Sequence, residues 1–143
     1  MNEPQTIESI MTKEVVTCDI NQPLRDVNHL FATHHIRHMP ILSEEALVGI
    51  ISKTDIMRIS FGNIFGDEEV DDDDEVFDML SINQVMKHSP VTVEASTPIH
   101  EAARTFAQSE FHALPVTNNG KLVGILTTTD VIRYFMAKQD ALA

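Results

Sequence analysis

Residues 49–55 read Gly-Ile-Ile-Ser-Lys-Thr-Asp, and residues 124–130 repeat the pattern as Gly-Ile-Leu-Thr-Thr-Thr-Asp. In both stretches the apolar residues predict a buried β-strand, and the hydroxyl and acidic residues that follow are typical of the first turn of a helix. Each stretch therefore predicts a strand that runs directly into a helix. The free backbone N–H groups and the positive dipole end of a helix N-terminus favour a phosphate or another anion there.

A second interpretation of the same residues is purely structural. Ser52 with Asp55, and Thr127 with Asp130, have the spacing of a capping box, in which hydroxyl and acid each accept a hydrogen bond from the other residue's backbone N–H. For one copy, capping alone would be the favoured explanation because the motif is short and common. Two copies in register strengthen the ligand-binding interpretation.

The two stretches lie 75 positions apart, and the same offset aligns the chain without a gap from Ile7 to Tyr134. Several of the aligned residues are identical: Met11 and Met86, Pro23 and Pro98, Phe31 and Phe106, Pro40 and Pro115, Arg58 and Arg133. Such a period indicates a duplicated unit of about 55 residues. A unit of that size is marginally stable alone, so we expect the two repeats to form one compact domain.

Each repeat predicts the order strand, helix, strand, strand, helix, which is an α/β (α+β) fold. The predicted elements of the first repeat are strands at 15–18, 39–42 and 47–51 and helices at 21–34 and 53–61. Those of the second are strands at 91–93 and 114–117, a helix from 97, and the strand and helix of the second motif, after a turn at 118–120. We place the repeats at 7–60 and 82–136, with an acidic linker at 61–80.

The formal net charge of −12 is concentrated between Asp67 and Asp78, which include nine acids and no base. This run predicts a solvated, mobile connection, and we expect 67–75 to be dispensable for folding. A divalent-metal loop is the less favoured alternative, because four consecutive Asp side chains cannot all face one ion. Neither this run nor the nearly neutral remainder offers the basic face that nucleic acid or a membrane surface needs.

Other features argue against export and catalysis. No apolar run reaches the roughly 18 residues that span a bilayer, and the N-terminus does not resemble a signal peptide. Cys18, the only cysteine, suits a buried strand in a reducing, cytoplasmic setting. His34, His35 and His38 straddle a helix end and a strand start without a neighbouring Cys or acid, so we expect no metal site. The usual nucleophile, metalloprotease and P-loop patterns are absent, which predicts no enzymatic activity.

The duplicated unit resembles a tandem pair of cystathionine-β-synthase (CBS) domains, a Bateman module, over nearly the whole chain. The residues that carry the resemblance are Ile10-Met11-Thr12, Met39-Pro40-Ile41 and 49–55 in the first repeat, and Val85-Met86-Lys87, Leu114-Pro115-Val116 and 124–130 in the second. The resemblance implies two repeats packed with pseudo-two-fold symmetry, each with the element order predicted above. We expect a stand-alone module with no effector domain attached.

For this family the resemblance implies an adenosine-containing ligand, AMP, ADP, ATP or S-adenosylmethionine, in clefts between the repeats, with no cofactor. The two aspartates of the motifs would bond ribose hydroxyls, and the serine and threonines of the motifs would line the phosphate or ribose region. The threonines before the first strands would contact adenine, and the residues before the second strands would supply an apolar wall and a phosphate-facing group. One cleft would combine Thr17, Ile36 and Arg37 with Thr127, Thr129 and Asp130. The other would combine Thr92, Phe111 and His112 with Ser52, Thr54 and Asp55.

The chemistry of these side chains suits such a ligand independently of the family, because a carboxylate accepts sugar hydroxyls and a helix N-terminus binds phosphate. We therefore predict a non-catalytic regulatory module that senses adenine nucleotides, and hence cellular energy status, and signals occupancy to an unidentified regulated protein. Apolar helix faces predict a homodimer with a self-complementary interface. The alternative is a ligand-free dimerisation or protein-interaction module of the same fold, because capping boxes also explain the site residues.

Overall fold

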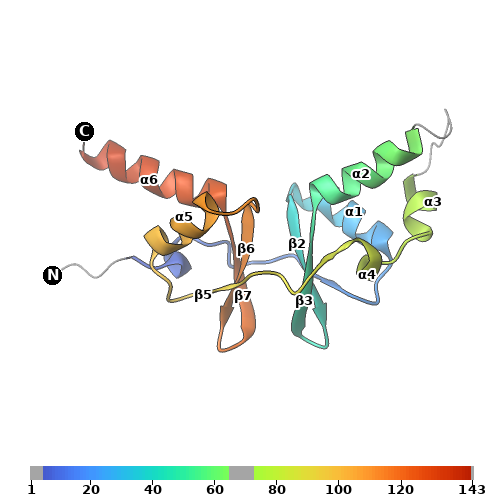
Figure 1. Cartoon of the computed structure of the whole chain (residues 1–143), viewed down its shortest axis with the longest axis horizontal. Helices are drawn as coiled ribbons and strands as arrows, with labels where there is room; N and C mark the ends of the chain where they lie inside the picture. Colours follow the sequence, from blue (N-terminus) through green and yellow to red (C-terminus); the bar gives the residue numbers. More distant parts are fainter. Residues whose placement is uncertain (1–4, 65–72, 143) are drawn as a thin grey trace. The chain divides into compact units, whose positions relative to one another are not determined.

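The computed structural model describes residues 5–64 and 73–142. Its packing divides the chain into two units, shown with their elements in Figure 1. Unit 2 is the continuous segment Val16–Pro90, whereas unit 1 combines the N-terminal segment up to Val15 with the chain from Val91 onward. The middle of the chain therefore forms one unit, and its two ends together form the other.

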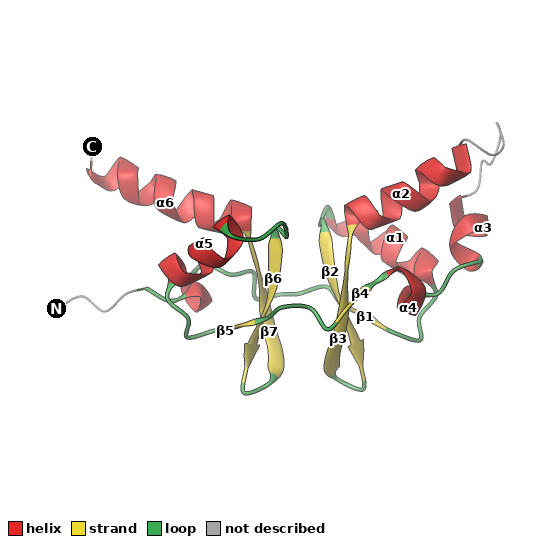
Figure 2. Ribbon diagram, viewed as in Figure 1, coloured by secondary structure: helices red, strands yellow, loops and turns green. Residues whose placement is uncertain are grey.

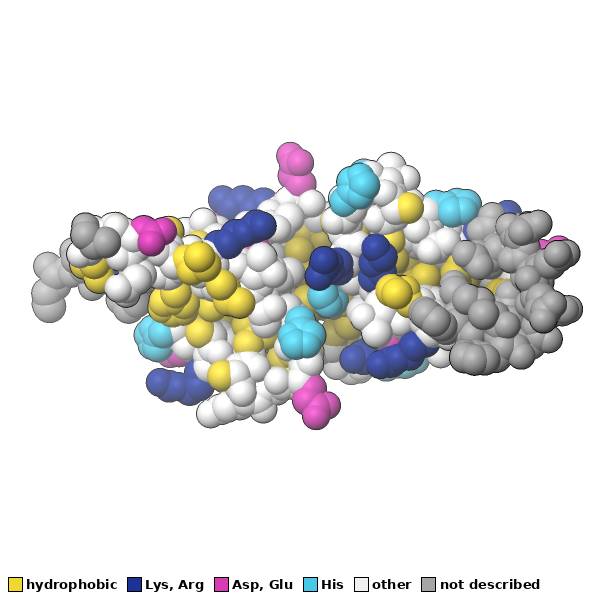
Figure 3. Space-filling view, turned by 90° about the horizontal axis from the view of Figure 1, so that it is seen from above, with side chains coloured by type: hydrophobic (Ala, Val, Ile, Leu, Met, Phe, Trp, Pro, Cys, Tyr) yellow, Lys and Arg dark blue, Asp and Glu magenta, His cyan; other side chains and the backbone are white. Residues whose placement is uncertain are grey.

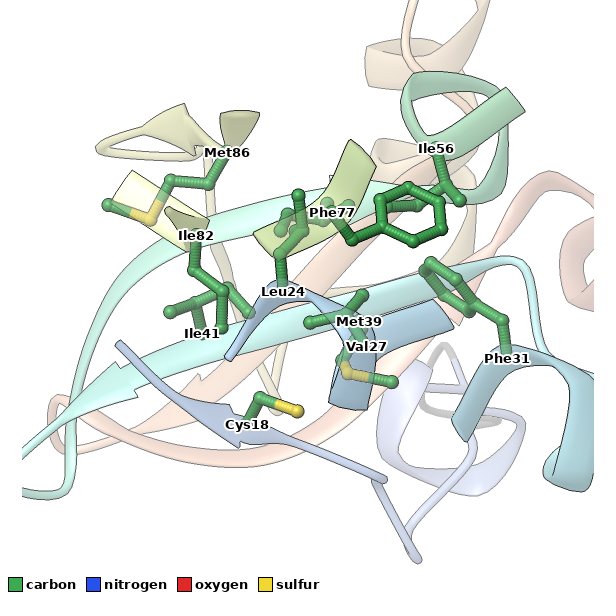
Figure 4. Close-up of a cluster of buried hydrophobic side chains, with 11 residues drawn as sticks. Cys18, Leu24, Val27, Phe31, Met39, Ile41, Ile56, Phe77, Ile82 and Met86 are labelled. Atoms are coloured by element: carbon green, nitrogen blue, oxygen red, sulfur yellow. The ribbon is translucent and has the colours of Figure 1, made fainter. Parts of the chain in front are cut away.

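Unit 2 contains a four-stranded sheet in the order β1-β2-β3-β4, with helices on one of its faces (Figure 2). Its elements are β1 (Cys18–Asp19), α1 (Leu24–His34), β2 (His38–Ser43), β3 (Ala46–Ser52), α2 (Lys53–Ile64), α3 (Asp73–Asp78), α4 (Ile82–Val85) and β4 (Lys87–His88). β1 and β2 are parallel, and the other two pairings are antiparallel. The apolar side chains of the sheet and helices form one buried cluster (Figure 4).

Unit 1 repeats this plan with the order β5-β6-β7. Its elements are η1 (Ile7–Ser9), β5 (Val93–Glu94), α5 (Ile99–Ala107), β6 (Ala113–Asn118), β7 (Lys121–Thr127) and α6 (Thr128–Leu142). The turn between β6 and β7 has positive φ angles of 54° at Asn119 and 83° at Gly120. These left-handed conformations are those that an Asn-Gly hairpin turn requires, so the predicted turn is confirmed.

The order strand, helix, strand, strand, helix is confirmed in both repeats, and with it the α/β fold class. The first strand of each repeat starts later than predicted: at Cys18 instead of residue 15, and at Val93 instead of residue 91. The reason lies in the pairing, because ladder contacts begin only at Cys18 opposite Ile41 and at Val93 opposite Val116. The apolar residues before them lie where the chain passes from one unit to the other.

The segment that leads each sequence repeat packs in the unit formed mainly by the other repeat. Thr12, near the start of the first repeat, pairs with Ile125 of β7 through two backbone hydrogen bonds of 2.9 and 3.0 Å. Lys87 of β4, near the start of the second repeat, pairs with Ile50 of β3. The two leading segments are thus reciprocally exchanged, and the packing units differ from the repeats at 7–60 and 82–136.

Gly49 and Gly124 make this close pairing possible. A Cβ atom at Gly124 would lie 2.9 Å from the Thr12 carbonyl oxygen, and one at Gly49 would lie 3.0 Å from the Lys87 carbonyl oxygen. Both neighbours are backbone atoms held in the sheet, and Met11 and Met86 also fill the space above the two glycines. A side chain at either position therefore has no room.

We expect Gly124→Ala to lower the free energy of unfolding by about 1–3 kcal/mol, the usual cost of overpacking a close contact. Urea denaturation measures this change. Lys121→Ala, at an exposed position of the same strand, is the matched control and should change stability by less than about 0.5 kcal/mol. If the two variants unfold at the same urea concentration, the close approach of Thr12 to Gly124 is contradicted.

The acidic segment is only partly described. Residues 67–72 of the acid run lie outside the described residues, and the run ends in α3. The prediction of a solvated connection is wrong at Phe77, whose side chain is 1% exposed and belongs to the core of unit 2. The Arg25 guanidinium, whose Nε donates to Asp78 Oδ1 at 2.9 Å, joins α1 to α3. Helix α4 follows with a complete Ser81–Gln84 capping box.

Cys18 is buried in β1, which confirms the predicted structural role of this residue. Burial raises the pKa of its thiol to about 11, and the nearby negative charge of Asp26 acts in the same direction. The thiol is therefore protonated at neutral pH, and a protonated thiol is a poor nucleophile and metal ligand. Separately, no helix among the described residues has the length and apolar character needed to cross a membrane.

Candidate functional site

Each repeated motif forms a direct junction between a strand and a helix. In unit 2, β3 ends at Ser52 and α2 begins at Lys53, and in unit 1 β7 ends at Thr127 and α6 begins at Thr128. The predicted absence of a loop at these points is confirmed. The first turn of each helix therefore presents its N–H groups at the end of the sheet.

Both motifs are capping boxes. The Ser52 N–H donates to Asp55 Oδ2 at 3.0 Å, and the Asp55 N–H donates to Ser52 Oγ at 3.1 Å. The equivalent bonds between Thr127 and Asp130 measure 2.9 and 3.2 Å. The structural interpretation of these residues is therefore confirmed. It does not exclude ligand binding, because the cap uses only one oxygen of each carboxylate.

The surroundings of the carboxylate oxygen that the cap does not use differ between the two junctions. Asp55 Oδ1 lies 3.6 Å from Arg58 Nη1, in an ion pair whose side chains are 14% and 75% exposed, respectively. Arg133 occupies the place of Arg58 in α6, but across the described part of the chain Asp130 has no ion-pair partner. Asp130 Oδ1 is thus more available to a ligand than Asp55 Oδ1. An exposed pair such as Asp55–Arg58 costs little to break.

The residues before β2 and β6 are fixed beside the junction of their own unit. The Lys53 N–H donates to the Arg37 carbonyl oxygen at 2.7 Å, and the Thr128 N–H donates to the His112 carbonyl oxygen at 3.0 Å. The side chains of Arg37 and His112 are exposed, so they are free to turn toward a bound molecule. Their main chains, in contrast, are held by the first residue of the helix.

The apolar residue directly before Arg37 and the one directly before His112 are each partly buried and partly exposed. Ile36 and Phe111 are half-buried and pack against the cores of unit 2 and unit 1, respectively. The Phe111 ring meets Phe106 edge to face, with centroids 6.3 Å apart. This contact fixes the ring orientation, so one function of Phe111 is structural. Its remaining exposed surface is available to an aromatic base.

Thr17 and Thr92 directly precede the first strand of each repeat. Because β1 runs parallel to β2, with Cys18 opposite Ile41, Thr17 lies toward the start of β2. The start of β2 is also where β3 ends, since His38 is opposite Ser52. Thr17 therefore lies toward the end of the sheet at which β3 runs into α2. The equivalent register in unit 1 places Thr92 toward the end at which β7 runs into α6. Thr17 is half-buried and Thr92 is exposed.

Each unit thus brings its own six predicted site residues to one end of its sheet. In unit 2 these are Thr17, Ile36, Arg37, Ser52, Thr54 and Asp55; in unit 1 they are Thr92, Phe111, His112, Thr127, Thr129 and Asp130. The pairing of residues from one repeat with the junction of the other stays a prediction. Within the described ranges, no group of three His, Cys, Asp or Glu side chains could hold a metal ion.

Sequence reasoning missed one charged residue, Lys53. It is the exposed first residue of α2, whereas Thr128 holds the same place in α6. The signal was present in the motif itself, because Lys replaces a hydroxyl residue there. Unit 2 therefore carries Arg37, Lys53 and Arg58 around its junction, which adds positive charge to the helix N-terminus.

The comparison with protein families identifies both repeats. The family model described as the CBS domain matches residues 7–62 and 82–137. A relative named uncharacterized protein MJ1225, from Methanocaldococcus jannaschii, is 26% identical over 94% of this chain. The chain spans 49% of the length of that protein and 38% of MJ1232 from the same organism.

Two solved structures with bound ligands share the fold. The CBS domain pair of protein MJ0100, in complex with 5-methylthioadenosine and S-adenosyl-L-methionine, has a TM-score of 0.79 and 24% identity, and the match covers 95% of this chain and 99% of that one. CBSX2 from Arabidopsis thaliana, in complex with AMP, has a TM-score of 0.75 and 24% identity, with coverage of 94% and 98%. Since the family model covers both repeats, the chain belongs to the CBS domain family, as a tandem pair of CBS domains.

Proposed function

We propose that this CBS pair is a regulatory module that binds an adenosine-containing ligand at its two junctions and signals occupancy to a protein partner. The observation that carries the proposal is the Asp130 carboxylate, which is held by its cap through one oxygen and leaves the other beside the helix N-terminus. A carboxylate held in this way can accept the hydroxyls of a ribose without first being ordered. The adenosine-containing ligands of MJ0100 and CBSX2 support this class of ligand.

The proposed roles follow from the chemistry of each side chain. Asp55 and Asp130 accept ribose hydroxyls, and the hydroxyl residues of the first helical turn, with its N–H groups, contact the phosphate or ribose. Ile36 and Phe111 provide apolar walls for the planar base, with Thr17 and Thr92 bonding its edge. Arg37 and His112 face the phosphate. As the resemblance implies, one ligand draws on Thr17 and Asp130, and a second draws on Thr92 and Asp55.

The proposed role is binding and not catalysis. The hydroxyl oxygens of Ser52 and Thr127 accept hydrogen bonds from the backbone of their capping acids. A nucleophilic hydroxyl instead needs an adjacent base that removes its proton. The buried, unreactive thiol of Cys18 fits a reducing setting, which for this chain we propose to be the cytoplasm.

A thermal-shift screen tests the ligand class. AMP, ADP, ATP and S-adenosylmethionine are compared with GMP and with ribose 5-phosphate, which lacks the base. A ligand at a hundred times its dissociation constant adds about 2.7 kcal/mol to the stability, so we expect an increase of several degrees for at least one adenosine compound. Equal shifts with GMP would contradict recognition of adenine, and no shift with any millimolar ligand would contradict the proposal.

Helix α6 supports a second role, dimerisation, which also underlies the alternative of an interaction module. Ile132, Phe135 and Met136 are 57%, 43% and 61% exposed, and their spacing places them on one face of the helix. Figure 3, which looks onto α2 and α6, shows hydrophobic side chains at the surface over α6. Exposed apolar groups of this kind mark interaction surfaces.

We expect multi-angle light scattering at micromolar concentration to give twice the 16.0 kDa chain mass. Met136→Lys should shift the protein toward the monomer, because it places a charge in an apolar contact. Met79→Lys, at a position 81% exposed outside this helix, should leave the mass unchanged. A monomeric unmutated protein would contradict the dimer and leave the ligand proposal standing.

A further inference from the structure

The segment 5–13, here called the arm, packs along β7 as an integral part of unit 1. Ile7 is fully buried in the core of that unit, and its N–H donates to the Thr97 carbonyl oxygen at 2.9 Å. Thr12 exchanges two backbone hydrogen bonds of 2.9 and 3.0 Å with Ile125. The arm is therefore held by a buried side chain near its start and by backbone pairing near its end.

Met11 lies between these two anchors in the sequence and contacts β7 directly. Its sulfur and terminal methyl group occupy the space over Gly124 in which a Cβ atom of residue 124 would lie. The side chain also packs against the core of unit 1. Because Gly124 has no side chain of its own, the flexible thioether of Met11 is the group that fills the contact between the arm and β7.

Met86 is the equivalent residue in unit 2, where its sulfur occupies the same space over Gly49. The two methionines differ in exposure: Met86 is 6% exposed and belongs to the buried core, whereas Met11 is only half-buried. A peroxide must reach the sulfur of a methionine in order to oxidise it. Met11 is therefore the more accessible of two side chains that have the same packing role.

The other sulfur-containing side chains lack this combination of access and packing. Among the described residues they comprise two buried ones, Cys18 and Met39, and three well-exposed ones, Met57, Met79 and Met136. Burial raises the pKa of the Cys18 thiol, and a protonated thiol reacts poorly with peroxide. Met79, in contrast, is 81% exposed, so its oxidation would disturb little packing.

We propose that Met11 is a modification site for hydrogen peroxide, and that its oxidation to the sulfoxide loosens the arm from β7. A lone pair of the sulfur attacks one peroxide oxygen, and the O–O bond breaks as the S–O bond forms. The proton of the attacked oxygen passes to the leaving hydroxide, which gives water. The sulfur loses the two electrons that the peroxide gains, so no further reactant is needed. The proposal concerns the packing of unit 1 and does not depend on ligand binding.

The sulfoxide does not fit the position that the thioether occupies. It adds a polar oxygen to a sulfur packed over Gly124, and burial of a polar group without a hydrogen-bond partner is unfavourable. If the side chain turns outward to hydrate this oxygen, the arm loses its apolar contact with Gly124. The pairing of Thr12 with Ile125 should then open more often. Ile125 lies two positions before Thr127, so the effect reaches the strand that leads into α6.

Peroxide treatment of the folded chain, followed by mass spectrometry of its peptides, measures the oxidation of each methionine. We expect Met79 to react first and Met11 next, while Met86 stays reduced. Amide hydrogen exchange, followed by NMR, then measures the arm contact. The Thr12 and Ile125 amides should exchange about tenfold faster after oxidation, because both are bonded only while the arm is docked. Unchanged exchange of the β2 and β3 amides in unit 2 separates this local effect from unfolding.

Met11→Leu is the matched control, because leucine keeps a similar apolar volume and cannot form a sulfoxide. In this variant, peroxide should leave the exchange of both amides unchanged. Met11→Gln places a polar group in the same position without any oxidant, and it should speed the exchange by a similar factor. Met79→Gln, at an exposed position, should have no such effect.

Three results would overturn the inference. In the first, Met11 stays reduced in folded protein whose Met79 is fully oxidised. In the second, Met11 is oxidised but the Thr12 and Ile125 amides exchange at an unchanged rate. In the third, peroxide speeds the exchange of these amides equally in Met11→Leu, which would assign the effect to another residue.

Discussion

Replacing Phe77 with alanine will lower the free energy of unfolding by about 3–5 kcal/mol, the usual cost of truncating a buried aromatic side chain. Phe77 is 1% exposed and lies in the same buried cluster as Leu24 and Ile56 (Figure 4). Since a domain of this kind is stable by roughly 5–15 kcal/mol, the variant should lose a large part of its stability. Urea denaturation followed by circular dichroism measures the change.

Met79→Ala is the matched control, because Met79 lies two positions further along the chain and is 81% exposed. It should change the stability by no more than about 0.5 kcal/mol. If the two substitutions have equal effects, α3 is not held on the core of unit 2. A large difference shows that α3, at the end of the acidic segment, is part of the fold of unit 2.

Replacing Asp130 with alanine should weaken AMP binding by about tenfold to a hundredfold, the cost of losing a carboxylate that bonds two ribose hydroxyls. Asp55→Ala should weaken AMP binding less at its own site, because one oxygen of Asp55 is already in an ion pair with Arg58. In the site proposed for Asp130 the phosphate-facing side chain is Arg37, whose guanidinium is always charged and binds phosphate through two hydrogen bonds. In the site proposed for Asp55 the phosphate-facing side chain is His112, which lacks the paired N–H donors of a guanidinium.

Loss of the cap must be separated from loss of the ligand contact. Asp130→Asn keeps an oxygen that can accept from the Thr127 N–H, so it should preserve most of the capping energy of about 1 kcal/mol. It should still weaken AMP, because an amide offers fewer acceptors to the ribose. Calorimetry on the folded variants decides the ranking: an equal or larger loss from Asp55→Ala would reverse it.

The sequence predicted the junctions well because two independent local signals coincide there. Apolar residues before Ser52 and Thr127 indicate a strand, and the hydroxyl and acid spacing indicates a capped helix start. Both signals depend only on neighbouring residues, so no tertiary information was needed. The difference between the two acids was not predictable, because Arg58 and Arg133 have the same spacing from Asp55 and Asp130. Of these two pairs, only Asp55 and Arg58 form an ion pair within the part of the chain that the structure describes.

The acidic segment shows where local signals fail. Charge dominates its composition, and composition predicts solvation, but burial of Phe77 depends on contacts with residues far away in the sequence. A usable signal was present next to it, since Ser81 and Gln84 have capping-box spacing and indicate the start of α4. The apolar Val76 and Phe77 just before it were the other sign of a packed segment.

The exchange of the leading segments could not be predicted for a different reason. A duplicated sequence contains two similar edges, at Ile50 and Ile125, and two similar segments, around Thr12 and Lys87. Periodicity shows which residues are equivalent but not which copy packs on which. The packing of each segment on the other repeat's sheet emerges only from the three-dimensional structure.

Isothermal titration of the unmutated protein with AMP tests the proposed adenosine-ligand role most directly. We predict saturable binding, at most two molecules per chain, that ribose 5-phosphate at the same concentration does not reproduce and that Asp130→Ala weakens by at least about tenfold. If titrations with AMP, ADP, ATP and S-adenosylmethionine all give only heats of dilution, the junctions are helix caps and nothing more, and the regulatory-ligand role is contradicted.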